Sequence, residues 1–130
     1  MVLPITLTAV AAAAVINLWL AVRVGQVRTS EKISIGDGGN EMLTRRMRAQ
    51  LNFAENTPLV LLLIGGIEFA QTHWSPVLMA VAAIYLLGRV AHGVGMDGKG
   101  FATGRSIGTM VTFLTQLGLA GWAVAIAAGW

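Results

Sequence analysis

The run VLPITLTAVAAAAVINLWLAV, residues 2–22, decides what kind of protein this chain forms. It contains no ionised side chain, and its length matches the roughly 20 apolar residues that a helix needs to cross the hydrocarbon core of a bilayer. No lysine or arginine precedes it, whereas a secretory signal peptide begins with a basic region. We therefore expect this run to stay in the protein as a membrane span.

Three further apolar stretches of similar length follow the first. The polar segment from Arg23 to Arg46 separates the first two stretches, and Gly36–Gly39 marks a turn within it. Shorter connections, at 71–75 and 97–104, join the others. The pattern predicts an all-α integral membrane protein, a four-helix bundle that forms a single domain over residues 1–130, with spans at about 2–22, 48–69, 76–96 and 107–130.

Composition excludes several other classes of protein. Hydrophobic residues make up 55% of the chain and charged residues 12%, with a mean hydropathy of +0.71. Soluble domains carry about 25% charged residues, and disordered chains carry more charge still. The chain has no cysteine, which excludes disulfides, thiolate metal sites and a protein thiol nucleophile. Two histidines without matching carboxylate spacing give no metal signal, so no metal site is expected.

The basic residues predict how the chain is oriented in the membrane. They flank the first and third connections, while both termini and the short connection around His73 carry neither lysine nor arginine. Under the positive-inside rule, the 23–47 loop faces the cytoplasm and both termini lie on the opposite side. This distribution accounts for the net charge of +3 and the isoelectric point near 10.2 without nucleic acid as a partner.

Ionisable groups inside the spans are costly and usually have a role. Arg48, Asn52 and Glu55 are spaced i, i+4 and i+7, so they share one face of the second helix. Arg89 and His92 share a face of the third. Glu55 needs a cationic partner, and three are open at this point: Arg48 on its own helix, Arg89 in an interhelical ion pair that sets helix register, or a cationic group on a ligand.

Several separated motifs carry a family resemblance. The stretch RAQLNFAENTP at 48–58 resembles the second-helix signature of the MAPEG superfamily, the membrane-associated proteins of eicosanoid and glutathione metabolism. GRVAH at 88–92, GRS at 104–106 and GQVR at 25–28 are similar to further motifs of the same superfamily, in the same order. Its members include microsomal glutathione transferase, leukotriene C synthase and microsomal prostaglandin E synthase. The GDGG loop at 36–39 is similar to that of small bacterial members.

The resemblance implies a homotrimer that binds glutathione between neighbouring subunits near the cytoplasmic end and takes a lipophilic substrate from the bilayer. It implies that Arg105 is the catalytic residue and stabilises the glutathione thiolate. Arginines would hold the two glutathione carboxylates, since a guanidinium fork suits them, while Asn52 would bind the peptide and Glu55 the ammonium. The residues implied in glutathione binding are Arg28, Arg48, Gln50, Asn52, Glu55, Arg89, His92 and Ser106.

One position departs from the superfamily pattern. Several members carry a tyrosine four residues after the position of His92, whereas this chain has Met96. The expected function is a glutathione-dependent transferase or peroxidase that acts on a lipophilic electrophile in a bacterial inner membrane. The alternative is a non-catalytic lipid-binding or helper protein on the same scaffold. A small transporter fits less well, because the chain lacks paired broken helices.

Overall fold

The computed structural model describes residues 2–71, 73–98 and 102–130. This part of the chain folds into four α-helices, which confirms the all-α prediction, and each helix is long and apolar enough to cross a membrane. The helices are α1 (Pro4–Glu31), α2 (Glu41–Ala70), α3 (Pro76–Gly95) and α4 (Thr103–Ala127).

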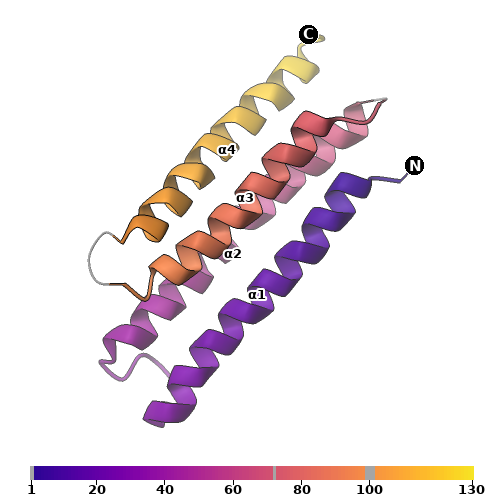
Figure 1. Ribbon diagram of the computed structural model, residues 1–130. Coiled ribbons are helices and arrows are strands. Elements are labelled where there is room, and N and C mark those ends of the chain that lie inside the picture. The colour runs from indigo at the N-terminus through magenta and orange to yellow at the C-terminus, as the bar shows by residue number, and fades with distance from the viewer. Residues whose placement is uncertain (1, 72, 99–101) are drawn as a thin grey trace.

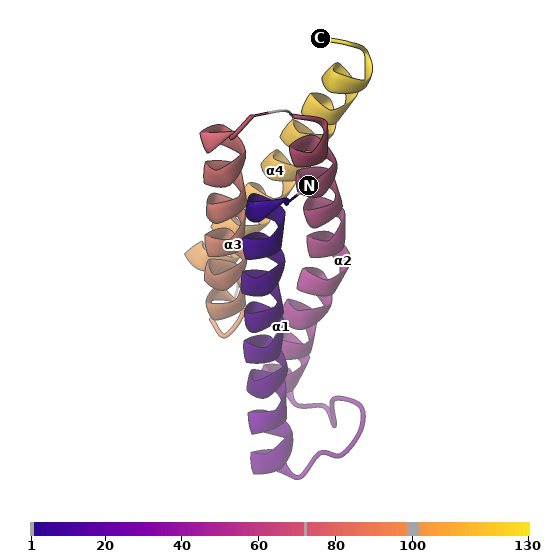
Figure 2. The same ribbon diagram turned by 90° about the vertical axis from the view of Figure 1, so that its right-hand side faces the viewer.

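The helices run up and down in one antiparallel bundle, with both termini at the same end (Figure 1). α2 and α3 lie in the middle, and each contacts the other and both outer helices. α1 and α4 lie on opposite sides and do not contact one another within the described residues (Figures 1 and 2). Both outer helices therefore present most of their surface to the surroundings of the protomer.

Local sequence explains where the helices begin. Asn40 caps α2, because its side chain accepts a hydrogen bond from the Leu43 amide at 2.9 Å, and Ser75 caps α3 by accepting from the Leu78 amide at 3.2 Å. Proline follows at the first position of α3 and also begins α1, where its missing N–H costs nothing. The short connection predicted at 71–75 is confirmed for its described residues, which exclude residue 72.

The helices extend beyond the predicted spans at the end opposite the termini. α1 continues past Val22 to Glu31, and α2 begins at Glu41, so only residues 32–40 connect them. This connection turns through Gly36, Gly38 and Gly39, whose φ angles of +56° to +71° favour glycine, which confirms the predicted turn. α4 likewise begins at Thr103, before the predicted span; residues 99–101 of the preceding connection lie outside the described residues.

The outer surface is apolar, as a membrane protein requires. Large aliphatic side chains such as Leu62 and Leu117 are 73% and 75% exposed. The interior near the termini is also apolar, with Val60, Ile64 and Leu119 almost completely buried. Lipid chains can cover the exposed surface, since they are as apolar as leucine.

Candidate functional site

Polar side chains of three helices line an open cleft at the end of the bundle opposite the termini. We call it the α2–α3–α4 cleft, and its volume is about 430 Å³. It contains five of the nine site residues expected from the sequence. The lining residues are Arg48, Leu51, Asn52, Glu55, His92, Met96, Arg105 and Thr109.

Arg89 lies behind this cleft, in the interior of the bundle. Its side chain is 1% exposed and donates to Thr112 Oγ1 and to Asn52 Oδ1, both at 2.6 Å. A third contact, 3.2 Å long, joins it to His92 Nδ1. A guanidinium can only donate, which assigns the ring proton of His92 to Nε2. Arg89 therefore orients two cleft residues, Asn52 and His92, from behind.

Glu55 does not pair with Arg89, so the interhelical ion pair considered from the sequence is wrong for this protomer. Arg89 uses neutral partners instead, because its guanidinium turns toward Asn52 and Thr112. Glu55 is exposed at the cleft and makes no ion pair with any residue that the structure describes. The pair with Arg48 is not formed either, so the remaining explanation of Glu55, a pair with a cationic group on a ligand, stays open.

A second cleft lies on the other side of α2, against α1. We call it the α1–α2 cleft; its volume is about 740 Å³, and Arg28 and Gln50 are among its lining residues. Arg28 also donates to the carbonyl oxygen of Gly36 at 2.8 Å, so it helps to hold the connection between α1 and α2. Arg48 and Leu51 line both clefts. The expected site residues thus divide between two surfaces that share one edge of α2.

One expected residue lies elsewhere, and two polar residues of α4 were missed. Ser106 is exposed and lines neither of the two clefts. Thr109 lines the α2–α3–α4 cleft, and Thr112 holds Arg89. They follow Arg105 at spacings of i+4 and i+7, so the three residues share one face of the helix. This polar face in an otherwise apolar helix could have been predicted from the sequence.

Glycines bring the backbones of α3 and α4 together beside the cleft. A Cβ atom placed on Gly95 would lie 2.2 Å from the Arg105 amide nitrogen. One placed on Gly108 would lie 2.4 Å from His92 Cβ and 2.5 Å from the Gly88 carbonyl oxygen. Contacts this short leave no room for any other residue type. The glycines therefore set the separation of Arg105 and His92 across the cleft.

A charged network closes the same end of the bundle, and the sequence did not predict it. Asp97 accepts from Arg46 at 3.2 and 3.0 Å and also pairs with Arg23. Arg23 donates further to the Gly93 carbonyl oxygen at 2.7 Å and stacks over the Trp19 ring. Burial disfavours the charged form of Asp97, but the bonds from Arg46 and the charge of Arg23 outweigh it and lower the pKa of the carboxyl. The network joins α1 and α2 to the end of α3.

Replacement of Asp97 by asparagine is expected to destabilise the protein at pH 7 by about 1.5–3 kcal/mol, the range for hydrogen bonds to charged groups. The folded pKa of Asp97 lies below the ordinary value of 3.8. The stabilisation is therefore complete above that value and disappears as the pH falls through the folded pKa. Melting temperatures of both proteins between pH 7 and pH 3 test this; Glu31→Gln, at an exposed acid at the end of α1, is the control. A difference in melting temperature between the unmodified and Asp97→Asn proteins that stays constant across this pH range would contradict the prediction.

Fold and site together define an integral membrane protein of four helices with an arginine-lined cleft at one end. Among residues 2–71, 73–98 and 102–130, no three histidine or acidic side chains gather as metal ligands. The sequence model of the MAPEG family matches residues 6–125. The chain belongs to the MAPEG family, which confirms the resemblance drawn from its motifs. A comparison with curated proteins gives no match.

Proposed function

We propose that the protein is a glutathione-dependent membrane transferase or peroxidase that acts on a lipophilic electrophile. The observation that carries this proposal is the juxtaposition, in one cleft, of the Arg48 and Arg105 guanidinium groups with the Glu55 carboxylate. Glutathione has two carboxylates, one ammonium and one thiol, so its charges complement those of the cleft. MAPEG membership supports the same ligand.

The unpaired charges of the cleft favour a ligand of this kind. Neither Arg48 nor Glu55 forms a hydrogen bond or an ion pair with the described residues. Uncompensated charges at membrane depth are costly, and a zwitterionic ligand with excess negative charge would compensate both. The Asn52 side-chain oxygen accepts from Arg89, and its amide N–H groups could donate to a peptide carbonyl of the ligand. The Nε2 proton of His92 could donate to the ligand in the same way.

Arg105 would promote the chemistry by stabilising the thiolate. A free thiol has a pKa near 8.5 and is mostly protonated at neutral pH, and the thiolate is the reactive form. A guanidinium beside the sulfur favours the charged form, and each unit of pKa shift corresponds to about 1.36 kcal/mol. In the transferase reaction the thiolate forms a bond to an electrophilic carbon of the lipophilic substrate and displaces a leaving group as an anion. In the peroxidase reaction it attacks a hydroperoxide oxygen, the O–O bond breaks, the alkoxide takes a proton to give the alcohol, and a second glutathione reduces the sulfenic acid to the disulfide and water.

We further propose that the protein assembles as a homotrimer with glutathione between neighbouring subunits. Arg28 and Gln50 line only the α1–α2 cleft, and most of the other expected ligand residues line the α2–α3–α4 cleft, so no single cleft contains all of them. A neighbouring copy that covers the shared edge at Arg48 and Leu51 would bring the two sets together. Arg28 and Gln50 of one copy would then face the cleft of the next.

The distribution of lysine and arginine supports an orientation in the membrane. Every lysine and arginine that the structure describes belongs to the half of the bundle opposite the termini. We propose that this end faces the cytoplasm, that both termini lie outside it, and that the membrane is a bacterial inner membrane. Membrane lipids would then surround the apolar outer surface.

The alternative is a non-catalytic protein that binds lipids or assists another enzyme. Met96 favours it, because this thioether lines the cleft and is only 8% exposed. A methionine makes the wall apolar and offers no strong hydrogen bond to glutathione. Turnover separates the two functions, because a helper protein would bind a ligand without converting it.

Glutathione is expected to raise the melting temperature of the detergent-purified protein. At a hundredfold excess over Kd, binding stabilises the native state by about 2.7 kcal/mol. Glu55→Gln keeps the shape of the side chain but removes its charge, so it should abolish most of this shift. Glu31→Gln, an exposed acid at the end of α1, should leave it unchanged.

The same experiment includes S-alkyl glutathiones, and the molecular mass in detergent reports assembly. The proposal fails if neither glutathione nor these analogues stabilise the unmodified protein. It also fails if Glu55→Gln breaks up the oligomer, because Glu55 would then be a structural residue.

A further inference from the structure

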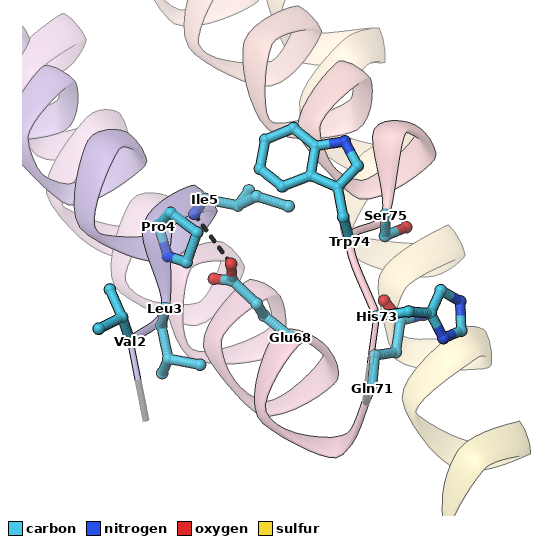
Figure 3. A pocket seen from close by; sticks show the side chains of 9 residues that line it. All are labelled: Val2, Leu3, Pro4, Ile5, Glu68, Gln71, His73, Trp74 and Ser75. Carbon is cyan, nitrogen blue, oxygen red and sulfur yellow. Dashed lines mark hydrogen bonds between the residues drawn. The ribbon is translucent and has the colours of Figure 1, made fainter.

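A third cavity lies at the opposite end of the bundle, where the chain termini are (Figure 3). Its volume is about 330 Å³. Residues 2–5, at the start of α1 and just before it, form one wall, and the end of α2 with the connection to α3 forms the other. The lining residues are Val2, Leu3, Pro4, Ile5, Glu68, Gln71, His73, Trp74 and Ser75.

Two acceptors of this cavity are the Gln71 amide oxygen and the Glu68 carboxylate. Gln71 Oε1 is buried and has no hydrogen-bond partner within the described residues. Buried polar atoms without partners are rare and destabilise the fold. An acceptor in this state is available to a donor bound in the cavity.

Glu68 adds negative charge to the same cavity. Its carboxylate accepts from the Ile5 amide at 2.9 Å and from the Thr6 amide and hydroxyl at 2.7 and 2.6 Å. A carboxylate has about four acceptor positions, so these three bonds fix its orientation without using them all. The sequence has no lysine or arginine before Arg23 or between Arg48 and Arg89. Glu68 forms no salt bridge with any residue that the structure describes.

We propose that this cavity binds a primary ammonium group. Such a group carries a positive charge and three N–H donors, which match the Glu68 carboxylate and the Gln71 oxygen. The Trp74 side chain, 58% exposed beside the cavity, is typical of the membrane–water boundary. The source is either the headgroup of an ethanolamine phospholipid, with its chains along the apolar wall of Val2 and Leu3, or a free amine in solution.

The chemistry excludes two other common headgroups. A choline headgroup has a positive charge but no N–H, so it cannot satisfy Gln71. A glycerol headgroup carries a net negative lipid phosphate without a cation, which Glu68 repels. The proposal is independent of glutathione, because it concerns the other end of the bundle.

The test measures thermal stability of the full-length protein in micelles doped with dioleoyl phosphatidylethanolamine, phosphatidylcholine or phosphatidylglycerol, and separately with free ethanolamine. Phosphatidylethanolamine is expected to bind about tenfold more tightly than phosphatidylcholine, since a hydrogen bond to a charged group supplies that difference. Gln71→Leu removes the acceptor and should abolish this preference, while Gln71→Glu should keep or strengthen it. Gln26→Leu, an exposed amide near the other end of α1, is the matched control.

Circular dichroism of each variant confirms that it folds before binding is compared. Stabilisation by free ethanolamine as strong as that by the lipid would identify the ammonium alone as the ligand, and stabilisation by the lipid alone would identify the phospholipid. Equal binding of the ethanolamine and choline lipids would overturn the proposal. So would a Gln71→Leu protein that keeps the preference.

Discussion

Replacement of Arg105 by serine is expected to lower glutathione-dependent turnover by about 10²–10³-fold, the usual effect of removing one group that stabilises developing charge. Arg105 is part of the α2–α3–α4 cleft, and its backbone position is set by contact with Gly95. Without the guanidinium, the thiol of glutathione should titrate near its free value of about 8.5. The measurement is the rate with a lipophilic electrophile in micelles, together with the molecular mass of the protein in detergent.

A pH profile separates loss of catalysis from loss of structure. Turnover of the Arg105→Ser protein should keep rising with pH up to about 8.5, whereas the unmodified protein should reach its plateau at a lower pH. Arg105→Lys retains the charge and should recover part of the activity. An Arg105→Ser protein with unchanged turnover and an unchanged profile would refute the assignment of Arg105. The non-catalytic alternative is correct if the unmodified protein and all variants bind glutathione but none of them converts any electrophile.

Replacement of Gly108 by alanine is expected to destabilise the protein by about 1–3 kcal/mol, the range for inserting a methyl group into a packed interior. The added Cβ would lie 2.4 Å from His92 Cβ and 2.5 Å from the Gly88 carbonyl oxygen. Backbone atoms cannot move aside as a flexible side chain can, so α3 and α4 must separate. Glutathione affinity should fall as well, because the separation moves His92 and Arg105 apart.

Gly118→Ala is the matched control for this substitution. Gly118 belongs to the same helix, and nothing lies within 4 Å of a Cβ placed there. This change should leave stability unchanged or raise it slightly, since alanine favours a helix by about 1 kcal/mol over glycine. Both proteins are compared by thermal unfolding and by glutathione titration. Equal melting temperatures for the two variants would mean that the close contact between α3 and α4 does not stabilise the fold.

Much of the fold was predictable from the sequence because the bilayer imposes simple requirements. Apolar runs of sufficient length predicted all four helices, and the glycines at 36–39 predicted the first turn. The ends of the helices in the polar region were harder to predict. The run from Arg23 to Glu31 is too polar to be predicted as part of a membrane span, yet it remains helical. Its Val24 and Val27 are buried, and its two arginines donate to backbone carbonyl oxygens of other segments.

The candidate site was predictable in part, and the limits have a physical cause. The spacing of Arg48, Asn52 and Glu55 placed them correctly on one face, because helical periodicity fixes relative direction within a single helix. Helical periodicity does not determine how α3 is rotated relative to α2 and α4, so it cannot predict which of their side chains the Arg89 guanidinium contacts. That rotation decided that Arg89 bonds Asn52 and Thr112 and leaves Glu55 without an ion pair in the protomer.

Sequence alone determined that this is a four-helix membrane protein of the MAPEG family, since hydropathy and motifs are properties of each segment by itself. Tertiary structure alone decided where the charged side chains lie. Arg89 is buried inside the bundle, Arg48 and Glu55 line the cleft, and Asp97 forms ion pairs at the end of the bundle. The reason is that these partners come from different helices. Their contacts depend on how closely the helices approach one another, and the glycines of α3 and α4 set that distance.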